Sequence, residues 1–356
     1  MAEVKPFRAV RYGERAGPLE ALVAPPYDVI SPEQRDELLA RDPHNVVHLT
    51  LPDDEAEAGR LWSEWRSDGV LAEDESACWW LSQDYVGPDG VARTRDGLVA
   101  ALRIQPYESR VVLPHERTHR GPKEGRLRLL RETRAQLEPL FFLYEGEPPV
   151  QRLDREPDLE ADGARLWKLS AEGIPDAFAD RQLLIADGHH RYETALAYHQ
   201  EAGTPESAYV LAVLVSLDDP GLMIFPTHRV FERVEGNGGS PYDEVKPALV
   251  DLEAQPQDRA GGVLYRREGI ELLQGRPGQL DVELAEDLDA EGITYTASIE
   301  EAIESVSRGD AEGALLVRPT RVEDVYAWAQ EGRVMPQKTT YFYPKLVSGL
   351  LFLPLD

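Results

Sequence analysis

Residues 183–196 read LLIADGHHRYETAL, which has the pattern of a buried strand, a tight turn and the start of a helix. The apolar run without a polar interruption predicts the strand, and residues recurring at helical spacing from Tyr192 predict the helix. Between them, Asp187 is expected to cap the helix and Gly188 to take the backbone angles of a sharp reversal. The first free N–H groups of the helix would then point outward, where anions bind.

Potential cations follow Gly188 at once, at His189, His190 and Arg191. Because the peptide dipoles already make a helix N-terminus positive, side-chain cations there indicate that something negative belongs among them. We therefore expect the run from Gly188 to Arg191 to bind phosphate oxygens, with Arg191 binding in a forked, two-point fashion. Ordinary Asp-Gly capping followed by a solvated first turn is the alternative interpretation.

Residues 186–195 and several other blocks resemble the DUF1015 family, a group largely without assigned function, over nearly the whole chain. The other blocks are residues 24–31, 45–49, 115–118 with 121–123, 226–229 and 335–345. The Asp-Gly-His-His-Arg core is also similar to the phosphate-binding turn of the ParB/sulfiredoxin superfamily. That superfamily includes nucleotide-dependent sulfiredoxins, CTP-binding ParB proteins and free-serine kinases.

These resemblances imply a mixed α/β fold of the α+β class. A ParB/sulfiredoxin-like core would carry additional N- and C-terminal α/β lobes. They also imply a nucleotide ligand, either ATP or ADP or else CTP, bound together with Mg²⁺.

The chain has 356 residues and a formal net charge of -27, so it is long enough for several substructures and is strongly acidic. Such a charge argues against a broad nucleic-acid surface and against adhesion to anionic membranes. Cys78 is the only cysteine, which excludes an intrachain disulfide. The N-terminus lacks the apolar core of a signal peptide and no apolar run reaches membrane-spanning length, so we expect a cytoplasmic protein.

Breaks in composition predict an N-terminal α/β lobe (1–150), a core with the Asp-Gly-His-His-Arg turn (160–235), and a C-terminal α/β lobe (241–356). Short alternating helices and strands are expected in the last lobe. Its apolar end, residues 346–353, is expected to pack back onto the body.

Local signals predict several elements of the N-terminal lobe. Ser31 and Gln34 form a capping box that starts a helix, and the spacing of Trp62 and Trp65 predicts a second helix that buries both rings. Residues 46–51 are expected to form a strand. Strands over residues 78–85 and 98–104 flank a hairpin connection.

Residues 115–119 read HERTH and match the His-Glu-x-x-His pattern of zinc hydrolases, with Glu138 at the distance of a third ligand. That pattern needs both histidines on one helix face, and prolines on either side of it would break the helix. A metal-dependent hydrolase using His115 and His119 is therefore the weakest of three functional hypotheses.

Glu116 has a second interpretation. A carboxylate in a loop beside His115, followed by Lys123, can act as a general base toward a substrate hydroxyl while the cations bind phosphate. A surface ion pair is the alternative. His228 and Arg229 follow a buried strand, at the kind of strand end where open α/β sheets bind ligands. The alternative there is a turn with a solvated His-Arg pair.

Three further residues are candidates for substrate contacts. Tyr27 and Asp28 lie on a loop stiffened by prolines, and Lys338 offers a cation among hydroxyls, although a polar strand entry explains it equally well. Either Asp28 or Asp187 would hold Mg²⁺, which usually takes one or two carboxylates plus phosphate oxygens.

The leading hypothesis is a nucleotide-dependent small-molecule phosphotransferase of the kinase type. Resemblance to the free-serine kinases implies that it acts on serine or a related hydroxyl metabolite, with Glu116, Asp187 and His190 as catalytic candidates. The alternative is a nucleotide-binding regulatory protein of the ParB-like type without turnover. The expected partners are a nucleotide and a small-molecule substrate, with no nucleic acid and no membrane.

Overall fold

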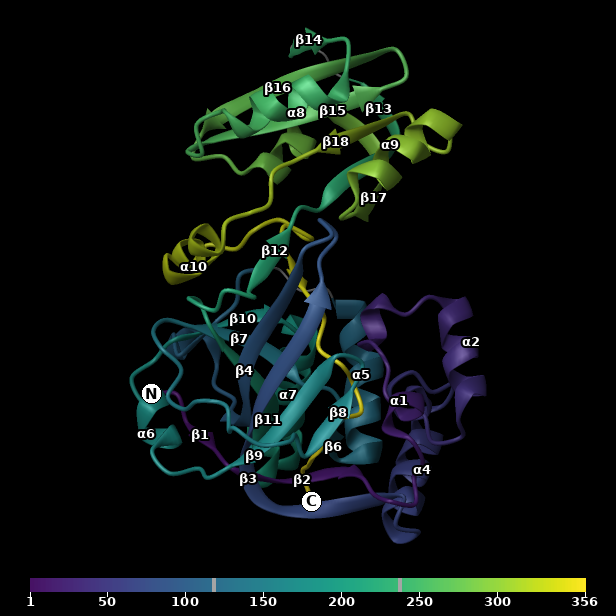
Figure 1. Cartoon of the computed structure of the whole chain (residues 1–356), viewed down its shortest axis with the longest axis vertical. Helices are drawn as coiled ribbons and strands as arrows, with labels where there is room; N and C mark the ends of the chain where they lie inside the picture. The colour runs from purple at the N-terminus through teal and green to yellow at the C-terminus, as the bar shows by residue number, and fades with distance from the viewer. Residues whose placement is uncertain (117–119, 236–238) are drawn as a thin grey trace. The chain divides into compact units, whose positions relative to one another are not determined.

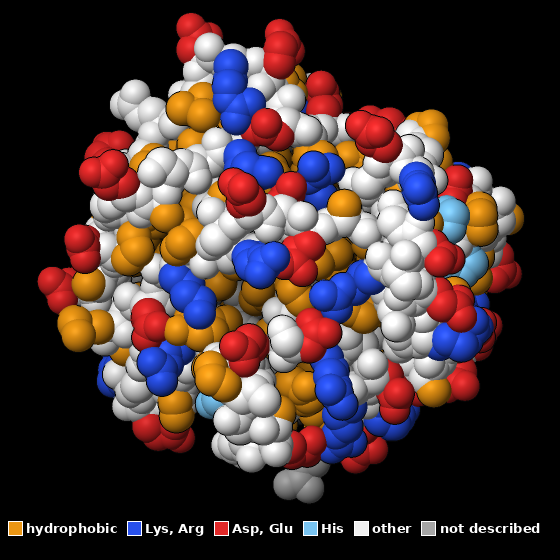
Figure 2. Space-filling view, turned by 90° about the horizontal axis from the view of Figure 1, so that it is seen from below, with side chains coloured by type: hydrophobic (Ala, Val, Ile, Leu, Met, Phe, Trp, Pro, Cys, Tyr) orange, Lys and Arg blue, Asp and Glu red, His pale blue; other side chains and the backbone are white. Residues whose placement is uncertain are grey.

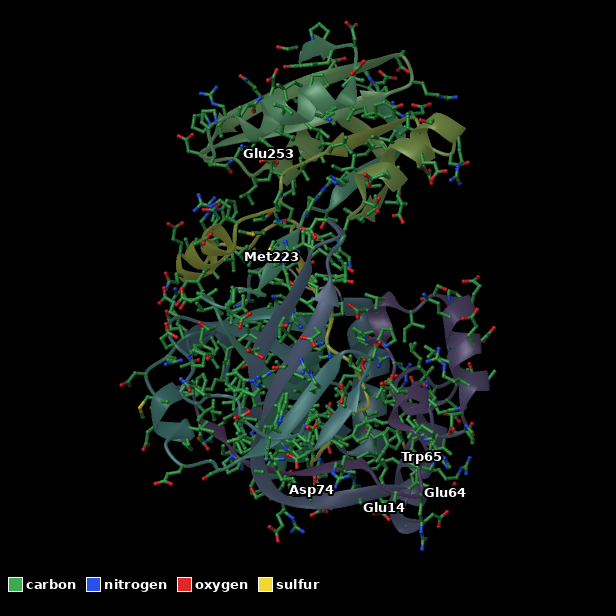
Figure 3. All side chains as sticks on the ribbon, in the orientation of Figure 1. Glu14, Glu64, Trp65, Asp74, Met223 and Glu253 are labelled. Carbon is green, nitrogen blue, oxygen red and sulfur yellow. The ribbon has the colours of Figure 1, made fainter. Side chains whose placement is uncertain are left out.

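The computed structural model describes residues 1–116, 120–235 and 239–356 (Figure 1). The chain divides into two compact units. Unit 1 comprises Met1–Gly87, Ala92–Leu222 and Pro344–Asp356, and unit 2 comprises Pro88–Val91 and Met223–Tyr343. Met223, labelled in Figure 3, begins the larger segment of unit 2.

Unit 1 is built on a mixed sheet with the strand order β5-β10-β7-β11-β4-β3-β9-β8. Strand β10 runs parallel to β5 and antiparallel to β7, and β11 runs parallel to β7 and antiparallel to β4. The strands are β3 (Leu71–Val86), β4 (Ala92–Arg103), β5 (Val112–Leu113), β7 (Leu140–Tyr144), β8 (Leu159–Ala161), β9 (Ala164–Leu169), β10 (Leu183–Asp187) and β11 (Tyr209–Ser216). Strands β1 (Val4–Lys5) and β2 (Phe7–Tyr12) pair with β4 and β3. This arrangement confirms the mixed α/β class.

The two faces of this sheet have different covers, because successive strand residues point to opposite sides. On one face the strands pack against Tyr192 of α7 (His189–Ala202) and Phe178 of α6 (Ile174–Phe178). Figure 1 shows α7 and α5 (Arg120–Thr133) behind the strands. On the other face lies the C-terminal segment, where Leu346 and Leu350 line a small apolar cavity with Val213. The last apolar stretch therefore packs against the sheet of unit 1.

Helices near the N-terminus follow their sequence signals. Helix α2 (Pro32–Arg41) begins after Ser31, whose Oγ accepts a hydrogen bond from the Gln34 N–H at 3.2 Å, and the reciprocal bond of the capping box is 3.0 Å. Helix α4 (Glu55–Ser67) buries Trp62 and Trp65, as predicted. Figure 3 labels Trp65 beside its neighbour Glu64 on this helix. Short pieces α1 (Leu19–Leu22) and η1 (Tyr27–Val29) precede α2.

The strand predicted over residues 46–51 was wrong, because this segment is helix α3 (Val47–Thr50). Buried Asn45 explains the difference. Its side-chain amide donates to the carbonyls of Ala21 and Val23, and its side-chain oxygen accepts from the Val47 N–H at 3.0 Å. These bonds reverse the chain into a helical turn and outweigh the β propensity of the valines, which depends on context.

Strand pairing crosses the predicted break near residue 150. Strand β11, from the predicted core, pairs with β4 and β7 from the predicted N-terminal lobe. Strand β13 (His228–Glu235) from the same predicted core belongs to unit 2. A composition break marks a loop, whereas a unit is defined by which strands pair and pack together.

Unit 2 is an antiparallel sheet in the order β14-β16-β15-β18-β13-β17, with a separate pair of β12 and β19. Helices α8 and α9 pack on one face, and η4 packs on the other. The elements are β12 (Met223–Phe225), β14 (Ser240–Tyr242), α8 (Val245–Glu253), β15 (Arg259–Arg266), β16 (Gly269–Pro277), η4 (Asp281–Asp287), β17 (Asp289–Thr296), α9 (Ile299–Arg308), β18 (Gly313–Leu316), α10 (Val322–Gln330) and β19 (Tyr341–Tyr343). The predicted alternation of short helices and strands is confirmed.

The remaining small elements belong to unit 1. They are η2 (Tyr107–Ser109), β6 (Ala135–Gln136), η3 (Glu206–Ala208) and β20 (Leu353–Pro354), which pairs with β6. Figure 2 shows one face of the molecule, on which basic and acidic side chains are interspersed rather than gathered by sign. Within the described ranges, no helix is long and apolar enough to cross a membrane.

Candidate functional site

The turn between β10 and α7 has the predicted strand-turn-helix form. Gly188 is the N-cap residue and has φ +99°, a left-handed conformation that an L side chain rarely adopts. No side chain caps this helix through the N-cap residue. The expectation that Asp187 caps it was wrong, because Asp187 pairs instead with Arg191 at 2.7 Å and with Lys345.

The parallel pairing of β5 and β10 places His115 next to this turn. Because β5 and β10 are parallel, their carboxyl ends lie at the same end of the sheet, and His115 and Glu116 follow β5 after Pro114. The ring centroids of His115 and His189 are 4.6 Å apart, and the backbone N–H of His115 donates to Nε2 of His189 at 3.3 Å. Nδ1 of His115 is 2.7 Å from the carbonyl oxygen of Ile185. Two motifs more than 70 residues apart in sequence are thus adjacent in space.

Burial keeps both of these histidines neutral. It lowers the pKa of His115 to about 4 and the pKa of His189 well below its ordinary value. His189 also accepts a hydrogen bond at Nε2, which a protonated ring cannot do. The sequence suggested that His189 adds positive charge to the turn, but in the structure it is a neutral member of a buried pair. His190 is half-buried on the same first turn.

Arg191 is the central cation of the turn. Its Nη1 donates to the carbonyl of Pro139 at 2.7 Å and its Nη2 donates to Asp187 at 2.7 Å. Burial alone would lower the pKa of Arg191, but Glu138, Asp187 and Asp28 raise it above its ordinary value. The side chain is only 11% exposed, so this arginine stays charged inside the protein.

Asp187 is likewise largely buried and charged. Burial alone would raise its pKa, but Lys345 and Arg191 together bring it well below its ordinary value. The side chains of Lys345 and Asp187 are 19% and 16% exposed. One carboxylate therefore faces two cations, and this trio has a net positive charge at the N-terminus of α7.

A second group of side chains surrounds Arg191 on the side of α5. Glu138 is 5% exposed and accepts from the Tyr27 N–H at 3.0 Å and from Ser348 Oγ at 3.1 Å. The guanidinium of Arg126 lies 3.7 Å from the Tyr27 ring centroid and 3.7 Å from Glu138. A cavity of about 40 Å³ lies between Arg126, Glu138 and Arg191, which is enough for a few water molecules.

Sequence reasoning missed part of this site. Lys345 ends one of the family-like blocks and stands between an aromatic strand and an apolar tail, but it was not singled out. Glu138 was considered only as a zinc ligand, whereas in the structure it lies beside Arg126. The signal available in the sequence was the apolar stretch around each residue. A charged side chain that is buried within such a stretch needs a partner of opposite charge.

The predicted residues of the C-terminal half lie together in unit 2. Arg229 is 3% exposed and donates from Nη2 to the carbonyl of Lys338 at 3.1 Å, and from Nη1 to the carbonyl of Thr227. His228 is 1% exposed and its Nδ1 accepts from the Val317 N–H at 3.2 Å. The Lys338 side chain is exposed. His228 and Arg229 are thus buried rather than solvated at the start of β13.

Two predicted residues fall where the structure is not described. His119 lies outside the described residues, and Lys123 lies on α5 without a described side chain. Among the described residues, no group of three or more His, Cys, Asp and Glu side chains could hold a metal ion. The zinc hypothesis, which needs His119, stays a prediction.

Comparisons with known proteins give one strong match. A family model described as "Protein of unknown function (DUF1015)" matches residues 4–291. No curated protein matches.

Several solved structures are similar at low identity. A free serine kinase in complex with AMP is 14% identical, with 67% of this chain and 89% of that chain covered and a TM-score of 0.38. SbnI from Staphylococcus aureus, with a C-terminal truncation, is 11% identical, with 71% and 87% covered and a TM-score of 0.39. A conserved hypothetical protein from Pyrococcus furiosus is 15% identical, with 67% and 92% covered and a TM-score of 0.35. The ParB/sulfiredoxin-like character of the core stays a prediction.

Proposed function

This chain belongs to the DUF1015 family, and we propose that it is a nucleotide-dependent phosphotransferase whose β10–α7 turn binds the phosphate groups of ATP or ADP. The observation that carries the proposal is the trio of Asp187, Arg191 and Lys345 at the start of α7. Two largely buried cations share one carboxylate beside a helix N-terminus, a position that already favours anions. A phosphate group bound there would contact both cations, in addition to the carboxylates of Glu138 and Asp28 that also act on Arg191.

The backbone of the turn supports the same ligand. Gly188, with φ +99°, precedes the first turn of α7, whose N–H groups have no acceptor within the helix. A Cβ at this position would lie 3.1 Å from Leu140 Cγ and 3.3 Å from Arg191 Nη2, so a larger residue would crowd the guanidinium. The glycine therefore leaves room where phosphate oxygens would meet Arg191.

Glu116 is the proposed base for the acceptor hydroxyl. It follows His115, which the parallel pairing of β5 and β10 brings to the turn, and its side chain is half-buried. In the proposed reaction Glu116 takes the proton of a hydroxyl as the hydroxyl oxygen attacks the terminal phosphate. The resemblance of the motif to free-serine kinases makes serine or a related hydroxyl metabolite the proposed acceptor.

Asp28 suits a Mg²⁺ role better than Asp187 does. Each oxygen of Asp187 is already paired with a cation, Oδ2 with Arg191 and Oδ1 with Lys345. Asp28 is exposed on η1 and lies near enough to raise the pKa of Arg191. A Mg²⁺ ion held there with phosphate oxygens would neutralise charge on the transferring group. For His228, Arg229 and Lys338, which lie in unit 2, a ligand-binding role stays a proposal.

The occupied state of Asp187 also favours a second candidate, a nucleotide-binding regulatory protein without turnover. A carboxylate that is fully paired with cations can organise a phosphate site without taking part in chemistry. In that case CTP or another nucleotide would bind and no acceptor would be phosphorylated.

Thermal unfolding with ATP, ADP and CTP, each with and without Mg²⁺, tests the proposal. A ligand at a hundred times its Kd stabilises the folded state by about 2.7 kcal/mol and raises the melting temperature. The informative variant is Arg191→Lys, which keeps a cation for Asp187 but loses the planar fork. We expect it to lose most of the nucleotide-induced shift. Arg131→Lys, at an exposed ion pair with Glu201, is the matched control and should keep the full shift.

Turnover is then tested with radiolabelled ATP and a panel of hydroxyl metabolites that includes serine. Glu116→Gln should abolish phosphate transfer and keep the nucleotide-induced shift. Binding without transfer to any acceptor would favour the regulatory alternative. No shift with any nucleotide at millimolar concentration would refute both.

A further inference from the structure

Arg95 is a buried arginine whose hydrogen-bond partner is a neutral amide. It lies on β4, is 1% exposed, and its Nη2 donates to Oε1 of Gln83 at 2.5 Å. Its guanidinium carbon lies 4.5 Å from the ring centroid of Phe141. Its Nη1 is buried and has no hydrogen-bond partner among the described residues. An amide and an aromatic ring do not balance a full charge, and an unpaired buried donor is costly.

A tight turn near Gly221 packs against β4 beside Arg95. The Tyr85 hydroxyl donates to the Gly221 carbonyl at 2.7 Å, and the carboxylate of Asp219 accepts from the Asp96 N–H at 3.2 Å. A Cβ on Gly221 would lie 2.0 Å from the carbonyl oxygen of Thr94. The backbone near Gly221 therefore packs closely against the backbone of β4 beside Arg95.

Arg95 lies on the same face of the sheet as Asp187 of the β10–α7 turn. Phe141, which lies under the guanidinium, is the register partner of Asp187 across β7 and β10. Gln83 bridges the two places, because it accepts from Arg95 and donates from Nε2 to the backbone carbonyl of Lys345 at 3.3 Å. A chain of contacts therefore runs from Arg95 through Gln83 to Lys345 and on to Asp187.

The electrostatics agree with this placement. Burial lowers the pKa of Arg95 to about 10, and the titratable groups that act in the opposite direction are Tyr85, Asp219 and Asp187. Asp219 provides part of the counter-charge, and burial raises its own pKa. The charge of Arg95 is therefore only partly compensated in the protein without ligand.

We infer that Arg95 is a further anion-binding residue of the β10–α7 site, whose Nη1 donates to an oxygen of the bound phosphate group. That the ligand is a nucleotide rests on the proposed function. That an anion binds beside Arg95 rests on the geometry of Arg95 itself. Arg95, Lys345 and Arg191 would then surround the phosphate chain from β4, the C-terminal segment and α7. The phosphate would provide both the counter-charge and the hydrogen-bond acceptor for Nη1 of Arg95.

Arg95→Met tests this, because methionine keeps an apolar stem against Phe141 and removes the charge. Titration calorimetry with ATP, inorganic pyrophosphate and adenosine measures binding, and thermal unfolding measures stability without ligand. We expect at least about a tenfold loss of affinity for ATP and pyrophosphate, since a hydrogen bond to a charged group is lost. Affinity for adenosine should not change. The melting temperature without ligand should stay equal or rise, because an uncompensated buried charge is removed.

Arg181→Met is the matched control. Arg181 also lies over an aromatic ring of unit 1, with its guanidinium carbon 4.6 Å from the Tyr144 centroid, but it is partly exposed. Substitution of Arg181 should leave the affinities for ATP and pyrophosphate unchanged. If Arg95→Met fails to fold, Arg95→Gln, which keeps a polar contact for Gln83 without the charge, takes its place with the same expected losses.

The outcomes separate this inference from the proposed function. A lower melting temperature with both affinities within twofold of wild type would show that Arg95 is only structural. If Arg191→Lys weakens ATP binding and Arg95→Met does not, this inference fails and the proposed function stands. If the wild type binds pyrophosphate through Arg95 but does not bind ATP, the nucleotide proposal fails alone. If the wild type binds neither anion, both fail.

Discussion

At the scale of single residues, the site is a set of charges whose states are set by burial. Asp187 stays ionised because Arg191 and Lys345 outweigh the effect of burial. His115 and His189 stay neutral because burial lowers the pKa of each ring. The positive charge available to a ligand therefore comes from arginine and lysine side chains, and it should not change over the physiological pH range.

His115 should make stability depend on pH. Burial lowers its folded-state pKa to about 4 from an ordinary value of 6.5. Between these values the unfolded chain takes up a proton that the folded protein does not, so the free energy of unfolding falls as the pH falls through this window. The full effect is about 1.4 kcal/mol per pH unit for one group.

His115→Asn isolates this contribution, because its amide can still donate to the carbonyl of Ile185. We expect the stability advantage of the wild type over His115→Asn to shrink from pH 7 to pH 5, as measured by urea unfolding. The carboxylates are common to both proteins, so their titration largely cancels in the difference. Parallel pH curves for the two proteins would contradict the assignment of a neutral, buried His115.

At the scale of elements, the β10–α7 unit shows where local sequence was sufficient. An apolar run, a glycine and a helical spacing predicted the strand, the turn and the helix, and all three are confirmed. Residues 46–51 show the opposite case. Their valines favour a strand locally, but the hydrogen bonds of Asn45 to a distant segment make them a helix.

Gly188→Ala should destabilise the protein through this turn. A positive φ costs a non-glycine residue about 1–2 kcal/mol, and the new Cβ would also lie 3.1 Å from Leu140 Cγ. At the other end of α7, Gly203 has φ +65°, and a Cβ there would meet no neighbouring atom within 4 Å, so Gly203→Ala isolates the backbone effect. Denaturant unfolding should show a larger loss for Gly188→Ala. Equal losses would mean that crowding at Gly188 is unimportant.

At the scale of the whole molecule, the C-terminal segment Pro344–Asp356 belongs to unit 1, although it follows unit 2 in the sequence. It supplies Lys345 to the site and Phe352 to the core, and it pairs with β2 between Val10 and Phe352. The end of the chain is therefore structural for unit 1 and is also part of the proposed phosphate site.

Phe352→Ala should be strongly destabilising. The ring is fully buried, with centroids 5.9 Å from Tyr12 and 5.4 Å from Trp62, so truncation leaves a cavity that costs about 3–5 kcal/mol. Asp356→Ala, in the same segment, removes a partly exposed ion pair with Arg66 and should cost less than about 1 kcal/mol. Urea unfolding monitored by tryptophan fluorescence measures both. A small effect of Phe352→Ala would mean that the segment is not part of the unit 1 core.

Part of the candidate site could be read from the chain, and part could not. The turn at Gly188 was found because its chemistry lies within a few consecutive residues. Lys345 and Arg95 were not singled out, because nothing beside them in sequence shows that one would face Asp187 and the other would be buried beside a neutral amide. Those facts depend on which strands pair and on what covers the sheet.

The mixed α/β class and the family came from the resemblance of motif blocks spread along the chain. Local patterns in the amino-acid sequence were enough for the strand-turn-helix that begins at residue 183 and the capping box at Ser31. Each of these depends on residues that are close along the chain, where propensity and spacing act directly. Only the tertiary structure decided that Lys345 pairs with Asp187, that His189 is neutral and that Arg95 is buried beside a neutral amide. These features depend on contacts between segments separated by tens to hundreds of residues, and the burial those contacts create determines which charges are paired.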